Sequence, residues 1–188
     1  MRATTAIILA AGLSSRMQGR QKLLLPIGGK PMLQHTLDLT ARLPFTWTIL
    51  VTVPNVAAGI KTAAEIVINP TPEAGQNSSI RLGVLAAPLG DSLLFLTGDQ
   101  PFLDEATLHA ILAADDGASI VYPTGPDGAP KSPVLFPPHF REALLALTGD
   151  EGGRQLRRQY PEACRAVRIA DEKTLLDIDT PEDYERSM

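Results

Sequence analysis

The sequence has few cysteines, no long apolar run and no excess of positive charge, and each of these absences excludes a class of protein or site. Cys164 is the only cysteine among 188 residues, which excludes an internal disulfide and a zinc site built from several cysteines. No apolar run approaches the ~20 residues that cross a bilayer. Lys and Arg number 17 against 21 Asp and Glu, a net charge of −4, so a general nucleic-acid-binding surface is not expected.

The same scarcities predict a cytoplasmic protein without membrane contact, because a lone cysteine suits a reducing compartment. The first residues, MRATTAIILAAG, contain an apolar run near the lower length limit of a secretory signal, but they are more typical of a strand that leads into a functional loop. The isolated histidines His35, His109 and His139 show no metal-ligand spacing.

What the chain does have is an alternation of apolar, β-branched runs with helix-like patterns. Strands are expected at 5–10, 47–53, 65–69, 92–98, 118–123, 133–136 and 164–169. Helices are expected at 31–42, 55–63, 78–87, 104–114, 138–147, 151–159 and 181–186. Continuously apolar strands separated by helices predict an α/β fold, with a mostly parallel central sheet covered on both faces. No linker divides the chain, so residues 1–188 are expected to form one domain.

In such sheets, ligands bind at the carboxyl ends of strands near a topological switch point. The first loop in that position, AAGLSSRMQGRQKLLL (10–25), is longer than the usual two to six or so residues. Gly12 lets backbone N–H groups approach a phosphate closely. Hydroxyl donors and positive charge follow at Ser14, Ser15, Arg16, Arg20 and Lys22. The pattern predicts a phosphate-binding loop without the Walker or dinucleotide fingerprint; a solvated basic loop is the alternative.

Carboxylates follow at two further places. In FLTGDQP (95–101), Asp99 comes directly after a buried strand, although a plain turn also explains Asp and Gly there. In LLDIDTPEDY (175–184), Asp177 and Asp179 would share one face of an extended segment, and Thr180 would cap a helix. Asp99 and Asp179 together could hold Mg²⁺, which takes a few carboxylates along with waters and phosphate oxygens.

Three polar or glycine-rich segments have two explanations each. Gln76, Asn77, Ser78 and Ser79 can recognise a nucleobase edge, and Ser78 or Ser79 can equally cap a helix. The segment 148–159, with three glycines before Arg154, could be a second anion subsite or a plain helix entry. The turn-rich segment 122–132 could be a surface turn or the rim of a pocket.

The motifs, taken in order, resemble those of the molybdenum-cofactor nucleotidylyltransferases. The matching stretches are LAAGLSSRMQGRQKLLLPIGGKPML, GQNSSIRLG, GDQP, PVLF, GDEGGR and DIDTPEDY, and they span essentially the entire chain. The resemblance implies a Rossmann-like nucleotidyltransferase fold and transfer of a nucleoside monophosphate from a triphosphate to molybdopterin, with loss of pyrophosphate. Ala11 before Gly12 resembles the cytidylyl-transferring branch, so CTP is expected rather than GTP.

The resemblance also implies roles for residues. The nucleotide site would be formed by Leu9, Ala10, Ala11, Gly12, Arg16, Lys22, Gln76, Asn77, Ser78 and Ser79. Catalysis would depend on Arg16, Lys22 and Asp99, with Mg²⁺ on Asp99 and Asp179. The acceptor side would include Lys131, Ser132, Gly152 and Arg154. Here the chain departs from the pattern: Lys131-Ser132-Pro133 stands for Gly-His-Pro, and Gly152-Gly153-Arg154 for Gly-Ala-Arg.

The expected partners are therefore CTP or GTP, molybdopterin and, transiently, molybdoenzyme maturation proteins. Three alternatives stay open. One is a GTP-using molybdopterin guanylyltransferase, and another is a nucleotidylyltransferase for sugar or alcohol phosphates. The third is a catalytically silent nucleotide-binding protein that handles a cofactor.

Overall fold

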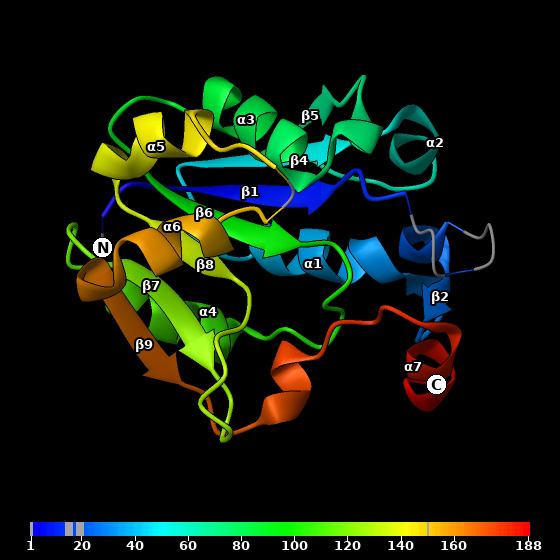
Figure 1. Cartoon of the computed structure of the whole chain (residues 1–188). Coiled ribbons are helices and arrows are strands. Elements are labelled where there is room, and N and C mark those ends of the chain that lie inside the picture. The colour runs from blue at the N-terminus through cyan, green and yellow to red at the C-terminus, as the bar shows by residue number, and fades with distance from the viewer. Residues whose placement is uncertain (1, 14–16, 18–20, 150) are drawn as a thin grey trace.

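Seven strands form one sheet in the order β5-β4-β1-β6-β8-β7-β9 (Figure 1). The computed structural model describes residues 2–13, 17, 21–149 and 151–188. The strands are β1 (Thr4–Ala10), β4 (Trp47–Thr52), β5 (Glu65–Ile68), β6 (Ser92–Thr97), β7 (Ile120–Thr124), β8 (Val134–Phe136) and β9 (Cys164–Arg168). Only β8 runs antiparallel to its neighbours. The predicted α/β fold and all seven predicted strands are confirmed, with ends shifted by one or two residues.

Helices cover both faces of this sheet because successive strand residues point to opposite sides. On β1, Ile8 packs in the core that includes helices α1 and α4, whereas Ile7 packs in the core that includes α3, α5 and α6. The longer helices are α1 (Met32–Thr40), α3 (Gln76–Ala86) and α4 (Glu105–Ala113). The shorter ones are α2 (Pro54–Ala57), α5 (Arg141–Leu145), α6 (Arg154–Gln159) and α7 (Pro181–Arg186). Both faces of β1 are thus buried, which explains why its sequence is continuously apolar.

Two differences between the predictions and the structure lie beside the loop after β1. The helix expected at 55–63 is only the four residues of α2, since the chain turns at Gly59, where a Cβ would lie 2.7 Å from Leu24 Cδ2. A small hairpin of β2 (Pro26–Ile27) and β3 (Lys30–Pro31) was not expected. Its turn residues, Gly28 and Gly29, have φ of 55° and 86°, the conformation that a two-residue hairpin turn requires.

The strand order places a switch point between β1 and β6. From β1 the chain moves outward through β4 to β5, then returns to place β6 on the other side of β1. The two carboxyl ends meet there: Leu9 is paired with Thr97, and the Gly98 amide donates to the Leu9 carbonyl at 3.1 Å. A parallel sheet opens for a ligand at such a point. Among the described residues, no helix is long and apolar enough to span a membrane.

Candidate active site

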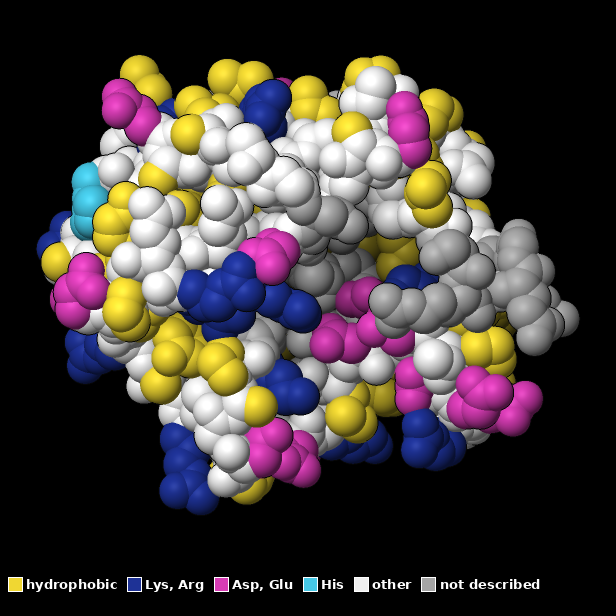
Figure 2. Space-filling model, in the orientation of Figure 1, with side chains coloured by type: hydrophobic (Ala, Val, Ile, Leu, Met, Phe, Trp, Pro, Cys, Tyr) yellow, Lys and Arg dark blue, Asp and Glu magenta, His cyan; other side chains and the backbone are white. Residues whose placement is uncertain are grey.

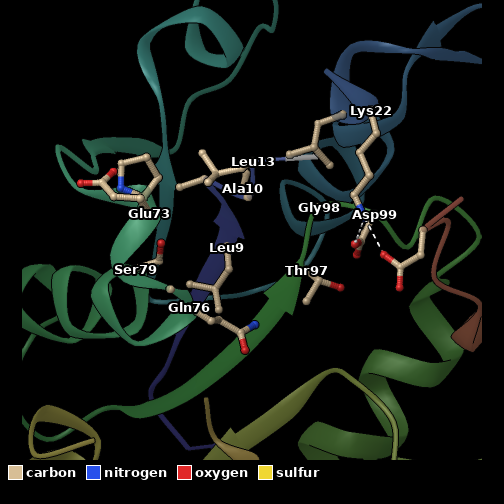
Figure 3. A pocket seen from close by; sticks show the side chains of 16 residues that line it. Leu9, Ala10, Leu13, Lys22, Glu73, Gln76, Ser79, Thr97, Gly98 and Asp99 are labelled. Carbon is tan, nitrogen blue, oxygen red and sulfur yellow. Dashed lines mark hydrogen bonds and ion pairs between the residues drawn. The ribbon is translucent and has the colours of Figure 1, made fainter. Parts of the chain in front are cut away.

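A cleft of about 410 Å³ opens at the carboxyl ends of β1 and β6. Figure 2 shows acidic side chains gathered in this hollow, with Lys and Arg side chains beside it. The lining residues come from the loop after β1, the start of α3, the end of β6 and the C-terminal segment, as Figure 3 shows for most of them. They are Leu9, Ala10, Ala11, Gly12, Leu13, Lys22, Leu23, Pro72, Glu73, Gly75, Gln76, Ser79, Thr97, Gly98, Asp99 and Asp179.

The end of β6 delivers Asp99 to the cleft. Gly98 makes this possible because a Cβ at that position would lie 2.9 Å from Leu33 Cδ1, too close for the strand to pack as it does. Asp104, not Asp99, caps α4 by accepting the Thr107 amide at 2.8 Å. Asp99 is therefore not used as a helix cap, and its side chain is 18% exposed in the cleft.

Lys22 joins the two carboxylates that the sequence singled out. Its Nζ donates to Asp99 Oδ2 at 2.7 Å, to Asp179 Oδ1 at 2.8 Å and to the Ile178 carbonyl at 3.1 Å. Figure 3 shows the Lys22 side chain reaching down to Asp99. An ammonium has three donor hydrogens, so these contacts use all of them. To hold a phosphate as well, Lys22 must exchange at least one of these contacts.

The charges of this cluster shift two pKa values. Burial works to lower the pKa of Lys22, but attraction to Asp99 and Asp179 outweighs it, and the pKa lies above its ordinary value. The pKa of Asp177 is raised to about 7, first by desolvation and then by repulsion from Asp99 and Asp179. Asp177 is exposed, so solvent screens part of this repulsion.

The C-terminal segment is fixed in place by contacts at both ends of Asp179. The Ile178 amide donates to the Asp99 carbonyl at 3.0 Å, which ties this segment to the end of β6. Beyond Asp179, Thr180 and Asp183 form the capping box that begins α7, and this confirms the predicted helix start. Asp179 therefore reaches the cleft from a segment that is anchored on either side.

Two buried oxygens in the cleft lack a hydrogen-bond partner among the residues the structure describes. They are Asp99 Oδ1 and Thr97 Oγ1. An unpaired buried acceptor costs ~1–3 kcal/mol, so such atoms mark where a ligand or ion can bind. No group of three or more His, Cys, Asp or Glu side chains in the described ranges is arranged for a metal. Two carboxylates nevertheless fit an ion that also takes waters and phosphate oxygens.

The start of α3 divides the predicted base-recognition residues into two pairs. Gln76 and Ser79 line the cleft. Asn77 donates instead to the Gly149 carbonyl at 2.6 Å, and Ser78 donates to the Gly75 carbonyl at 2.7 Å. The capping alternative for the serines is wrong, because α3 begins at Gln76, directly after Gly75 and without a side-chain cap.

The predicted acceptor-side residues lie around the cleft rather than in its lining. Lys131 is close enough to Asp177 to lower its pKa slightly, against the stronger effects that raise it. The Ser132 carbonyl accepts from Gln100 Nε2 at 3.3 Å. Gly152 abuts Gln76, and the exposed Arg154 begins α6. Ser14, Ser15, Arg16 and Arg20 lie outside the described residues, so the predicted roles of Arg16 remain predictions.

Sequence reasoning missed Thr97, Glu73 and Gln100. Thr97 lines the cleft as the last residue of β6, and Glu73 lines it from the turn before α3. Gln100 is fully buried behind Asp99, where its amide donates weakly to the Ser132 and Leu175 carbonyls. A polar residue that ends an apolar strand, as Thr97 does, was a usable signal; nothing local pointed to the other two.

A mostly parallel sheet with a polar cleft at its switch point defines a nucleotide-binding α/β enzyme. The MobA-like NTP transferase domain model matches residues 6–164, and the chain belongs to this family of nucleotidyltransferases. Purine catabolism protein PucB from Bacillus subtilis is 31% identical to this chain in an alignment 196 positions long. The alignment covers 95% of this chain and 93% of PucB. The bifunctional protein GlmU of Alkalilimnicola ehrlichii is 32% identical, but the match covers only 32% of GlmU.

Solved structures show the same architecture. Rv0371c from Mycobacterium tuberculosis H37Rv superimposes with a TM-score of 0.86 at 27% identity, covering 98% of this chain and 97% of that one. A nucleotidyl transferase from Methanothermobacter thermautotroptrophicus gives a TM-score of 0.84 at 25% identity, covering 98% and 95% of the two chains. Rv0371c has also been solved in complex with manganese.

Proposed function

We propose that this nucleotidyltransferase transfers CMP from CTP to molybdopterin, with release of pyrophosphate and dependence on Mg²⁺. The observation that carries the proposal is the cluster of Lys22, Asp99 and Asp179 in the cleft between β1 and β6. Asp99 Oδ1 adds a buried oxygen with no partner among the described residues. A cation and two carboxylates at the end of a parallel sheet suit a metal-bound triphosphate.

The reaction brings together two anions, an acceptor phosphate oxygen and the α-phosphate of the triphosphate. A divalent cation held by Asp99 and Asp179 would supply the positive charge that lets the two approach. The manganese complex of Rv0371c supports a divalent ion in this family of folds. No covalent intermediate with the protein is needed, because alignment of the two substrates supplies much of the rate.

The chain's own residues then divide the work. Gly12 and its neighbours present backbone amides at the end of β1, where phosphates can approach closely. Lys22 exchanges a carboxylate contact for a phosphate oxygen and stabilises the charge that develops on the leaving pyrophosphate. Asp99 and Asp179, released from Lys22 in part, gain the capacity to bind the cation. The observed triad is thus the resting arrangement of groups that the substrate rearranges.

Different residues support the choice of nucleotide and the choice of acceptor. Ala10 and Ala11 line the cleft with small apolar side chains, and the LAAG pattern supports CTP. Gln76 and Ser79 supply hydrogen-bonding groups for the base. Lys131 and Arg154 are basic residues outside the lining of the cleft, and their positive charge would suit a phosphorylated pterin.

Pyrophosphate release by the purified protein tests the proposal directly. CTP, GTP, ATP and UTP are each supplied with Mg²⁺, with and without molybdopterin. Release that requires molybdopterin and prefers CTP is the expected result. Release with GTP but not with CTP, in the presence of molybdopterin, would make the protein a guanylyltransferase. Release with sugar or polyol phosphates in place of molybdopterin would show that the proposed acceptor is wrong. Nucleotide binding without any release would leave a binding protein, and the catalytic proposal would be wrong.

A further inference from the structure

Gly152 makes an unusually close approach to a residue that lines the cleft. Its φ is +58°, and a Cβ built there would lie 2.3 Å from Gln76 Oε1 and 3.2 Å from Gln76 Cδ. Both facts require glycine: the backbone is in the left-handed region, and there is no space for a side chain. The atom in the way is the far end of a flexible side chain.

Three of the contacts that the described residues make between α3 and the segment joining α5 to α6 bear on Gln76. Asn77 Nδ2 donates to the Gly149 carbonyl at 2.6 Å, and one helical turn further on, Arg81 Nη2 donates to the Leu147 carbonyl at 3.4 Å. Gly152 closes the series against Gln76 at the cleft end of the helix. The described residues of the segment therefore lie along α3 and place Gly152 where any side chain larger than hydrogen would meet the end of Gln76.

Gln76 lines the part of the cleft beside the carboxyl ends of β1 and β6, where the nucleotide is proposed to bind. It lines that cleft together with Leu9 at the end of β1 and Thr97 at the end of β6, and Figure 3 shows these three side chains around the same stretch of it. A primary amide both donates and accepts, so its orientation decides which edge of a base it can pair with. A shift of about 1 Å in that amide is enough to lose a well-aligned hydrogen bond.

We propose that Gly152 is a positioning residue for base recognition: because it has no Cβ, the Gln76 amide can occupy the place from which it pairs with the base of the bound nucleotide. This inference rests on nucleotide binding in the proposed function, but not on the identity of the acceptor. It also gives the Gly152-Gly153 sequence a role on the nucleotide side of the cleft, where sequence reasoning placed it on the acceptor side.

The decisive variant is Gly152→Ala. The new methyl group displaces Gln76, which can move because its end is flexible. Gly28→Ala is the matched control: its φ is +55°, almost the same, but a Cβ there meets nothing within 4 Å. Both variants bear the strain of a left-handed alanine, so they should lose similar thermal stability. Only Gly152→Ala should change base recognition.

Calorimetric titration with CTP and with GTP, in the presence of Mg²⁺, measures the effect. We expect Gly152→Ala to weaken CTP binding about three- to tenfold, the loss of roughly one hydrogen bond, and to shrink the ratio of the two dissociation constants by a similar factor. Gly28→Ala should keep both constants within about twofold of the wild type. A loss of stability alone cannot change the ratio between two nucleotides bound by folded protein.

A double-mutant cycle with Gln76→Ala identifies the route of the effect. If Gly152 acts through Gln76, adding Gly152→Ala to Gln76→Ala should change the CTP dissociation constant by less than about twofold, because the side chain to be displaced is gone. An undiminished effect in the Gln76→Ala background would overturn the inference, as would unchanged nucleotide selectivity in Gly152→Ala alone. Wild-type protein that binds nucleotide but does not use molybdopterin would contradict only the acceptor, whereas failure to bind any nucleotide would overturn both proposals.

Discussion

The two halves of the cleft are built in different ways. The nucleotide half stands on the ends of β1 and β6, which pair in register, and its charged groups contact one another within 2.8 Å. The side that we propose for the acceptor is formed by a connection, the segment between β7 and β8 that carries Lys131. Its residues meet the rest of the protein mainly through backbone carbonyls, as when Ser132 accepts from Gln100 at 3.3 Å.

Residues at strand ends should therefore be harder to vary among related enzymes than residues on connections. Groups on strand ends are positioned by the whole sheet, so their geometry changes only with the fold. Groups on connections can change with a few substitutions, and here the departures from the expected pattern, at 131–132 and 152–153, fall on connections. If the proposed function holds, substitutions on these connections should alter the choice of acceptor more readily than the chemistry at the carboxyl ends of β1 and β6.

The largest expected effect comes from removing the charged groups of the nucleotide half. Asp99→Ala and Lys22→Ala should each lower the rate of pyrophosphate release by at least about 10³-fold, because aligned charges supply most of the acceleration in such transfers. Steady-state pyrophosphate release measures this. Glu162→Ala, at an exposed position before β9, serves as the control and should retain activity. Near-normal turnover by a folded Asp99→Ala protein would remove Asp99 from the catalytic role.

A substitution on the connection that carries Lys131 should affect the acceptor and leave nucleotide binding nearly unchanged. Lys131→Ala should raise the KM for molybdopterin about tenfold, the loss of one charge-assisted contact, and keep the CTP dissociation constant within about twofold. Initial rates at varied molybdopterin and calorimetry with CTP measure the two quantities. Equal losses for both substrates would show that the halves are not independent.

Loss of the α7 cap should act on stability and on the position of Asp179. Thr180→Ala should lower the free energy of unfolding by about 1 kcal/mol and Tm by roughly 2–4 °C, since the hydroxyl accepts the Asp183 amide at 3.1 Å. Thr180 also lowers the pKa of Asp183. That stabilisation is present at neutral pH and lost as the pH falls through the lowered pKa, so the difference between variant and wild type should shrink in acid. Thermal melts at several pH values measure it.

The smallest effect should appear at Asp177. Its pKa is raised from 3.8 to about 7, so the folded protein holds a proton that the unfolded chain releases, and stability falls as the pH rises between these values. In EDTA, Asp177→Asn should therefore melt above the wild type at pH 8 and with it near pH 3.5. Solvent screening should keep the gain to about 3 °C or less. An Asn variant that is less stable at pH 8 would contradict the direction of the shift.

The sheet could be predicted from the sequence because its signal is local. Runs such as TAIILA and SLLFLTG are apolar on both faces of the strand, and each forms a strand here. The β2–β3 hairpin escaped prediction because its strands are two residues long and bounded by Pro26 and Pro31, which usually argue against a strand. The start of α3 was placed two residues late because serine suggested a cap, whereas Gly75 precedes the helix without one.

The candidate site was predictable as a set of residues but not as a set of contacts. Asp99 could be placed at the end of a strand, and Asp179 near a helix start. That a single ammonium would bridge both could not be predicted, because nothing local encodes the distance between Lys22 and a carboxylate 77 or 157 positions away. Gly152 was assigned to an anion subsite for the same reason: its approach to Gln76 exists only in the folded chain.

The ion pair between Lys22 and Asp179 also orders events during synthesis. A ribosome makes Lys22 and the loop after β1 early, but Asp179 follows 157 positions later. Until that segment emerges and docks beside β6, the newly made chain has the lysine and Asp99 without the second carboxylate. The cluster of Lys22, Asp99 and Asp179 is therefore complete only after the segment that carries Asp179 has been made and has docked.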